Sequence, residues 1–177
     1  MKKIKNVQQG FTLLELLVVV LIIGILASSA LPQYQMAVTK AKVASILPLM
    51  RRFKDALAEY KLQHGSYLTE DGDYPDADTL GVNWPTDWEC YDNFATDCHN
   101  DYWSCYVNSD ESGFVGCGNR YFHIMMYQVD DPTYEALRGV RTCESLGEEG
   151  EKVCKALGGK LLEGVEGYYS DTVYKLN

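Results

Sequence analysis

The most constraining feature of this 177-residue chain is an apolar run of twenty-one residues, from Phe11 to Leu31. About twenty apolar residues cross a bilayer as an α-helix, because a helix rises about 1.5 Å per residue. The run contains a single carboxylate, Glu15. A charged side chain in a membrane segment is costly and is normally kept only where it has a partner or a task. The run therefore predicts a membrane helix in which Glu15 has a function.

A short basic arm precedes the apolar run. It carries three lysines among its first five residues and ends at Gly10. Ordinary secretory signals are cut after their apolar core, whereas a cut at this small residue would remove the arm and leave the helix on the mature chain. The lysines favour a cytoplasmic N-terminus, which places everything after Leu31 outside. We expect residues 1–10 to be a leader peptide that is removed.

The segment Gly10–Glu15, with the sequence GFTLLE, resembles the prepilin peptidase site of type IV pilins and type II secretion pseudopilins. Gly24, Pro32 and Tyr34 also stand where members of that family often carry such residues. The close resemblance covers roughly the first 35 residues and becomes looser along the rest of the helix. Beyond about residue 65 it implies nothing residue by residue, apart from an analogy at the last two cysteines.

The resemblance implies a role for four residues. A membrane peptidase would cut between Gly10 and Phe11 and methylate the new N-terminal amine of Phe11. Glu15 would neutralise that amine on an adjacent subunit. Thr12 would either form a hydrogen bond near the same charge or simply cap the start of the helix. The physical argument agrees, because opposite charges about 4 Å apart attract far more strongly in a low dielectric than in water, although desolvation offsets much of the gain.

The helix is predicted to continue beyond the membrane. No strong stop occurs before His64, so we expect one helix of about fifty-four residues, roughly 80 Å long. From Val43 onward, apolar residues recur every three or four positions, which predicts one buried face. Pro32 and Pro48 each lack an N–H and crowd the carbonyl four residues back, so each is expected to bend or locally melt the helix.

The amphipathic helix predicts a helix packed on a sheet, and the resemblance implies an α+β fold of the type IV pilin kind. A long N-terminal helix would pack on a small antiparallel β-sheet, with a disulfide-braced variable region. The expected parts are a leader (1–10), a transmembrane and filament-core helix (11–31), its amphipathic continuation (32–64) and an extracellular globular head (65–177).

Within the head, three segments read as β-strands. They are rich in β-branched or aromatic residues: Gly113–Cys117, Tyr121–Val129 and Gly167–Asp171. The stretch from Pro75 to Tyr106 is aromatic, polar and rich in cysteine, and we expect it to be irregular.

Six cysteines all lie in the part expected outside the cell, which favours disulfides formed in an oxidising compartment. Six cysteines allow fifteen pairings, among which sequence does not decide. We favour partners that are neighbours in sequence, and the last pair resembles the C-terminal disulfide loop of many type IV pilins. The favoured pairs are Cys90 with Cys98, Cys105 with Cys117, and Cys143 with Cys154.

Charge argues against nucleic acid as a partner. Residues 1–64 hold nine Lys and Arg against three Asp and Glu, while residues 65–177 hold seven against twenty-two. An acidic head lacks the basic surface that phosphate backbones require.

Metal binding and catalysis are also disfavoured. The cysteines are too widely spaced for a typical zinc site, and the acidic loop lacks the glycine and terminal glutamate of a calcium-binding EF-hand. No catalytic combination can be assembled from the three histidines, so we expect no enzyme and no cofactor. The residues considered were Asp71, Asp73, Asp76 and Asp78 for calcium, and His64, His99 and His123 for catalysis.

These observations predict a structural subunit that polymerises into a type IV pilus. It would begin as an inner-membrane precursor surrounded by lipid and end in an extracellular filament. The partners implied by the resemblance are further copies of the subunit, a prepilin peptidase, an inner-membrane assembly platform and an assembly ATPase. The alternatives are a type II secretion pseudopilin and a minor pilin at the filament tip acting as an adhesin through its aromatic head.

Overall fold

A computed structural model describes residues 11–91, 94–108, 113–131 and 133–177. The chain divides into two compact units, residues 1–38 and 39–177. Helix α1, Leu13–His64, belongs to both units and contains 52 residues. The prediction of one long helix is confirmed, with its start two residues later than expected.

Helix α1 ends at His64, directly before Gly65. The Gly65 N–H donates to the carbonyl of Lys61 at 2.7 Å, and Gly65 has a φ of 78°, a left-handed value that favours glycine at a helix C-terminus. Lys61 and His64 in the last turn complement the negative end of the helix dipole. Pro32 and Pro48 both lie inside the helix, which stays α-helical through both residues, so neither proline melts it.

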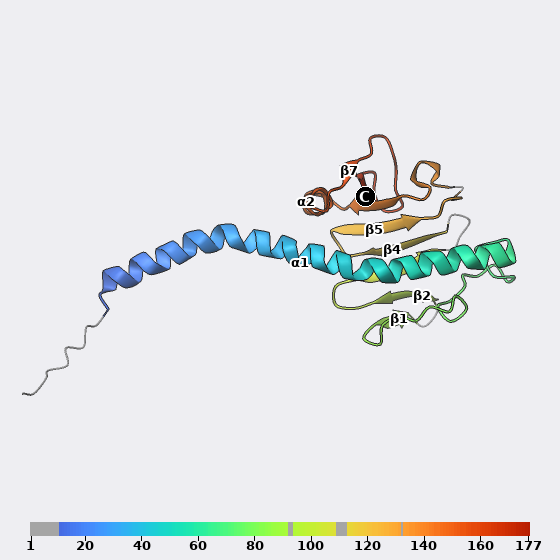
Figure 1. Cartoon of the computed structure of the whole chain (residues 1–177), viewed down its shortest axis with the longest axis horizontal. Helices are drawn as coiled ribbons and strands as arrows, with labels where there is room; N and C mark the ends of the chain where they lie inside the picture. Colours follow the sequence, from blue (N-terminus) through green and yellow to red (C-terminus); the bar gives the residue numbers. More distant parts are fainter. Residues whose placement is uncertain (1–10, 92–93, 109–112, 132) are drawn as a thin grey trace, which may run out of the picture. The chain divides into compact units, whose positions relative to one another are not determined.

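The head contains an antiparallel sheet with the strand order β1-β2-β3-β4-β5-β6-β8-β7 (Figure 1). A 3₁₀ turn η1 and a short helix α2 lie on either side of β6 in the sequence. The bounds are β1 Glu89–Tyr91, β2 Phe94–His99, β3 Ser104–Asn108, β4 Phe114–Gly118, β5 Phe122–Tyr127, η1 Glu135–Leu137, β6 Arg141–Ser145, α2 Glu148–Ala156, β7 Lys160–Leu161 and β8 Val173–Leu176.

The second part of α1, residues 39–64, packs on one face of this sheet. Six of its residues at spacings of three and four are buried, and each fully buried apolar side chain contributes roughly 1.5–3 kcal/mol. Alternate residues of β5, among them Ile124 and Met126, belong to the same core. The buried helix residues are Val43, Ile46, Met50, Phe53, Leu57 and Tyr60. The amphipathic prediction is therefore confirmed.

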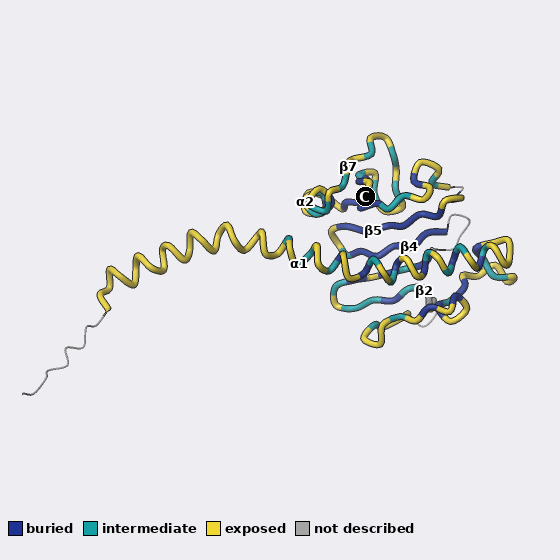
Figure 2. Tube along the Cα trace, viewed as in Figure 1, coloured by how far each residue is buried: buried dark blue, intermediate teal, exposed yellow. Residues whose placement is uncertain are grey.

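A second core covers the opposite face of the sheet. Phe114, Met125, Tyr127 and Val173 come from β4, β5 and β8, and Leu137 of η1 packs with them. Figure 2 shows β4 and β5 as buried. Burial on both faces explains why these strands read as continuous apolar runs.

Two strand expectations were wrong. The stretch from Pro75 to Tyr106 contains β1, β2 and the start of β3 instead of being irregular throughout. Conversely, Gly167–Asp171 forms no strand, and the last long strand is β8, which begins two residues later at Val173. The other two strand predictions are confirmed by β4 and β5, which occupy Phe114–Gly118 and Phe122–Tyr127.

Three disulfides join the described cysteines, and they link the neighbours in sequence that we favoured. Two of them connect adjacent strands, β1 to β2 and β3 to β4, while the third ties β6 to α2. The pairs are Cys90–Cys98, Cys105–Cys117 and Cys143–Cys154.

Candidate functional site

The first part of α1, residues 13–31, is apolar and exposed along its length. Leu13 is 88% exposed and Leu21 58%, and no part of the most apolar 18-residue window is buried. That window has a mean hydropathy of 2.6, so the helix is long and apolar enough to cross a membrane. Figure 2 shows this part of α1 as exposed throughout. A helix that is apolar on every side needs an apolar environment from outside the molecule.

Thr12 and Glu15 cap the start of this helix. The Thr12 N–H and hydroxyl both donate to Oε2 of Glu15, at 2.8 and 2.7 Å, and the Glu15 N–H donates to the Thr12 hydroxyl at 3.2 Å. This reciprocal capping box satisfies backbone donors that a helix start leaves unpaired. Among the described residues, Oε1 of Glu15 accepts no hydrogen bond. The carboxylate is thus held in place with one oxygen available.

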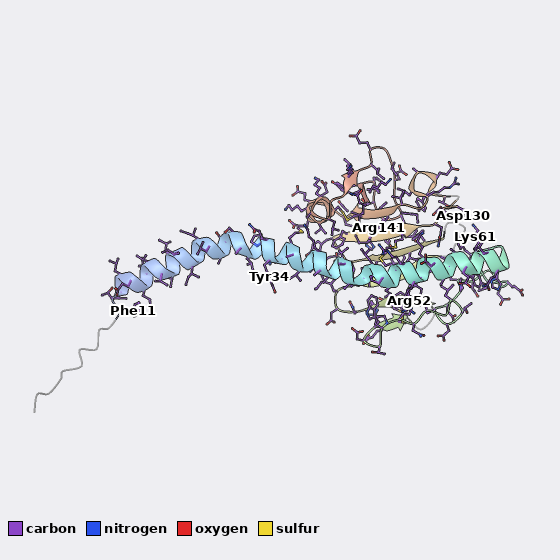
Figure 3. The ribbon with its side chains drawn as sticks, viewed as in Figure 1. Phe11, Tyr34, Arg52, Lys61, Asp130 and Arg141 are labelled. Atoms are coloured by element: carbon purple, nitrogen blue, oxygen red, sulfur yellow. A yellow bond between two sulfur atoms is a disulfide. The ribbon has the colours of Figure 1, made fainter. Side chains whose placement is uncertain are left out.

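The expected cleavage site lies next to this cap. Gly10 falls outside the described residues. Phe11 is the first described residue and is 83% exposed (Figure 3). It directly precedes Thr12, so the chain brings the expected new N-terminus within one residue of the capping box.

Small residues in the same helix have local roles. Gly24 has no heavy atom within 4 Å of the position where a Cβ would lie, which leaves its side of the helix open. The hydroxyls of Ser28 and Ser29 donate to the carbonyls of Ile25 and Leu26, at 2.7 and 3.1 Å. These hydroxyls therefore have partners without any contact outside the helix.

The acidic loop of the head is organised by its own backbone. The Thr79 N–H donates to Oδ1 of Asp76 at 2.7 Å, and the Asp73 N–H donates to the Thr69 hydroxyl at 3.1 Å. Among the described residues, no three His, Cys, Asp or Glu side chains group closely enough to hold a metal ion.

An ion pair near the end of α1 connects the helix to the loop after β5. Nζ of Lys61 lies 2.6 Å from Oδ2 of Asp130, and the Tyr67 hydroxyl donates to Oδ1 of the same carboxylate at 2.6 Å (Figure 3). The hydrogen bonds from Lys61 and then from Tyr67 lower the pKa of Asp130. Sequence reasoning missed this pair, since 69 residues separate its members and neither stands in a motif.

A buried carboxylate was also missed. Glu144 of β6 is fully buried and accepts from the Tyr127 hydroxyl at 2.6 Å and from the Tyr169 N–H at 2.8 Å. Burial raises the pKa of Glu144. The position of Gly167 beside this carboxylate leaves no room for a Cβ. This arrangement fastens the Gly167–Ser170 segment to the sheet.

Comparison with known proteins concerns mainly the first third of the chain. The family model described as the prokaryotic N-terminal methylation motif matches residues 5–31. The chain is 45% identical over 62 residues to the type IV major pilin protein PilE1 of Neisseria gonorrhoeae, a match covering 35% of this chain and 38% of that protein. The identity is also 45% over 62 residues to a fimbrial protein of Neisseria meningitidis serogroup B, covering 35% of this chain and 36% of the relative.

A third relative is also a fimbrial protein that matches over about a third of its length. The type IV major fimbrial protein FimA of Dichelobacter nodosus is 43% identical over 53 residues, covering 30% of this chain and 34% of FimA. The chain thus spans little more than a third of the length of the curated relatives it matches. No solved structure matches the chain. The methylation motif, the pilin and fimbrial relatives, and the long helix packed on an antiparallel sheet together support the type IV pilin family for this chain.

Proposed function

We propose that the protein is a type IV pilin, a structural subunit that polymerises into an extracellular filament. The observation that carries this proposal is the exposure of the apolar part of α1. In the precursor, lipid would surround residues 11–31, with the N-terminus in the cytoplasm. In the filament, the same surface would pack against the helices of other subunits. The head, residues 65–177, would form the outer surface.

Maturation would prepare the helix for this exchange. Cleavage between Gly10 and Phe11 removes the lysine-rich arm, and methylation converts the new amine of Phe11 to an N-methylated ammonium. The family match over residues 5–31 supports both steps. A prepilin peptidase, an inner-membrane platform and an assembly ATPase are the partners that this route requires.

Glu15 would then guide assembly. Its Oε2 is held by Thr12, and its Oε1 remains available to the ammonium of an incoming subunit. At about 4 Å and an effective dielectric constant near 20, such a pair attracts by about 4 kcal/mol before desolvation is subtracted. A head-to-tail contact of this kind does not close on itself, so it produces a fibre.

The test is the chemistry of the mature N-terminus together with the filament itself. Sheared surface filaments should contain this chain as their main band, and mass spectrometry should find N-methylated Phe11 as its first residue. A chain that keeps residues 1–10 and stays monomeric in the membrane would contradict the proposal. Presence as a scarce component of filaments made of another subunit would instead indicate a minor pilin.

A further inference from the structure

A cavity of about 390 Å³ opens between the second part of α1 and the C-terminal strands of the head. Four cationic side chains line it, Arg51 and Lys54 from α1, Arg141 from β6 and Lys175 from β8. One lining acidic side chain, that of Asp55, accompanies them, and Asn177 at the end of the sequence also lines the cavity. This concentration of positive charge is unusual in a chain whose formal net charge is −9.

Strand register decides which of these cations share the face that α1 covers. Arg141 pairs with Leu176 and Met126, both of which belong to the core under the helix. Lys175 pairs with Thr142 and therefore belongs to the opposite face. Arg51 and Lys54 are three positions apart on α1 and so lie on neighbouring parts of its surface. Three cations thus converge from two elements.

These three cations have no anionic partner in the part of the chain that the structure describes. None of them lies within 4.0 Å of a carboxylate oxygen, although twenty-five Asp and Glu residues are present in the chain. Asp55 stands four residues after Arg51, yet the two form no ion pair. Among the described residues, the three cations therefore line the cavity without a direct ion pair.

Arg141 adds a second, independent observation. Its Nε is buried and has no hydrogen-bond partner among the described residues. Buried N–H donors are nearly always paired with protein or with a bound group, since an unpaired one costs roughly 1–3 kcal/mol. Burial, followed by the positive charge of Arg51, lowers the pKa of the Arg141 guanidinium, so these two cations destabilise each other at close range.

We propose that this cavity binds an oxyanion of the phosphate class, held by Arg51, Lys54 and Arg141. A guanidinium presents a planar fork of donors that matches two phosphate oxygens, and a lysine adds a mobile point charge. The volume of the cavity lies within the range of small-ligand pockets. An anion there would pair with the cationic side chains and relieve the repulsion between the two arginines. The site stands independently of polymerisation.

The direct test is isothermal titration calorimetry of the full chain in neutral detergent micelles. Inorganic phosphate is the titrant, and the ionic strength is kept constant. Binding should be saturable at one site. Arg51→Gln and Arg141→Gln should each weaken the affinity for phosphate by about tenfold, the loss of one charge-assisted contact. Arg51 is exposed, so its variant keeps the fold even if Arg141→Gln disturbs the head.

The matched control is Arg52→Gln. Arg52 is exposed and adjacent to Arg51 but does not line the cavity, and Figure 3 labels it on the side of α1 away from Arg141. Its variant removes the same charge and should change the affinity less than about twofold. An equal loss of phosphate affinity in Arg51→Gln and Arg52→Gln would mean that the general positive charge of this region causes binding. That result would overturn the proposal.

Two further arms identify the source of the anion. Competition by glycerol phosphate as strong as that of inorganic phosphate indicates a free ligand, whereas stronger competition by mixed micelles containing phosphatidic acid indicates a lipid headgroup. Both results support a phosphate site. No saturable phosphate binding, combined with weaker self-association of Arg51→Gln, would overturn it in favour of an acidic segment of a second copy.

Discussion

The two parts of α1 share a secondary structure but have opposite surroundings. Leu21 in the first part is 58% exposed, whereas Leu57 in the second is fully buried. The second part has one apolar face, which a single sheet can cover. The first part is apolar on every side, and no single face of a folded head can cover such a helix. One helix thus combines a part that is buried against the head with a part whose apolar side chains are exposed.

Polar contacts follow the same division. In the second part, Gln128 donates through Nε2 to the carbonyl of Lys54 at 2.7 Å, and Lys61 pairs with Asp130. In the apolar part, the side-chain hydrogen bonds of Thr12 and Ser28 join residues three positions apart on the same helix. The second part is therefore fixed by the fold of the head, and the first depends on what surrounds it.

The largest expected effect is on assembly. Glu15→Ala should leave cleavage intact and reduce filament yield by about tenfold or more, because loss of the intersubunit ion pair exceeds 1.4 kcal/mol. Quantitative immunoblots of sheared filaments against whole-cell subunit measure the yield. Glu59→Ala is the control, since it removes an exposed acid from the second part of the same helix. Equal losses in the two variants would remove the special role of Glu15.

A matched pair of leucines tests the comparison directly. Leu57→Ala should lower the free energy of unfolding of the head by roughly 2–5 kcal/mol, since it leaves a cavity in the core. Leu21→Ala should change that free energy by less than about 0.5 kcal/mol, because its side chain is exposed. Urea unfolding in micelles gives both values. A large loss for Leu21→Ala would mean that the head packs on the first part too.

The third disulfide should stabilise the head alone. Replacing Cys143 and Cys154 by alanine opens a loop with a sequence separation of 11 residues and should cost about 3 kcal/mol in the chain-entropy view. The helix content of the first part of α1 should not change, which circular dichroism of the micelle-bound chain before and after head unfolding can show. Unchanged head stability would mean that α2 stays packed on the sheet without its covalent link to β6.

The smallest expected effect concerns pH. Burial lowers the pKa of His123 from 6.5 to about 4, so protonation favours the unfolded head. The stability contributed by the neutral imidazole is complete above pH 6.5 and is lost as the pH falls from 6.5 toward 4, by about 1–3 kcal/mol. His123→Gln should flatten this dependence in urea titrations, and His64→Gln, at the exposed helix end, should preserve it. If the free energy of unfolding of His123→Gln still falls between pH 6.5 and 4, another titratable group causes the pH dependence.

Much of the architecture was predictable because its signals are local. Three such signals are the apolar run, the amphipathic spacing from Val43 to Tyr60 and the stop at Gly65. Each is formed by residues that lie close together in the sequence. The same holds for the strand expected around Ile124. Strands β1 to β3, at one end of the sheet, were missed, since their polar residues resemble an irregular loop.

The amino-acid sequence by itself determined the long helix, its change from uniformly apolar to one-sided, the N-terminal motif and the confinement of the cysteines to the head. All of these depend on spacing along the chain. Only the tertiary structure decided that Lys61 meets Asp130, that Glu144 is buried beneath Gly167, and that Arg51 and Arg141 share a cavity. These contacts join residues tens of positions apart, and which distant groups meet depends on strand order and on the packing of α1, which no local pattern encodes.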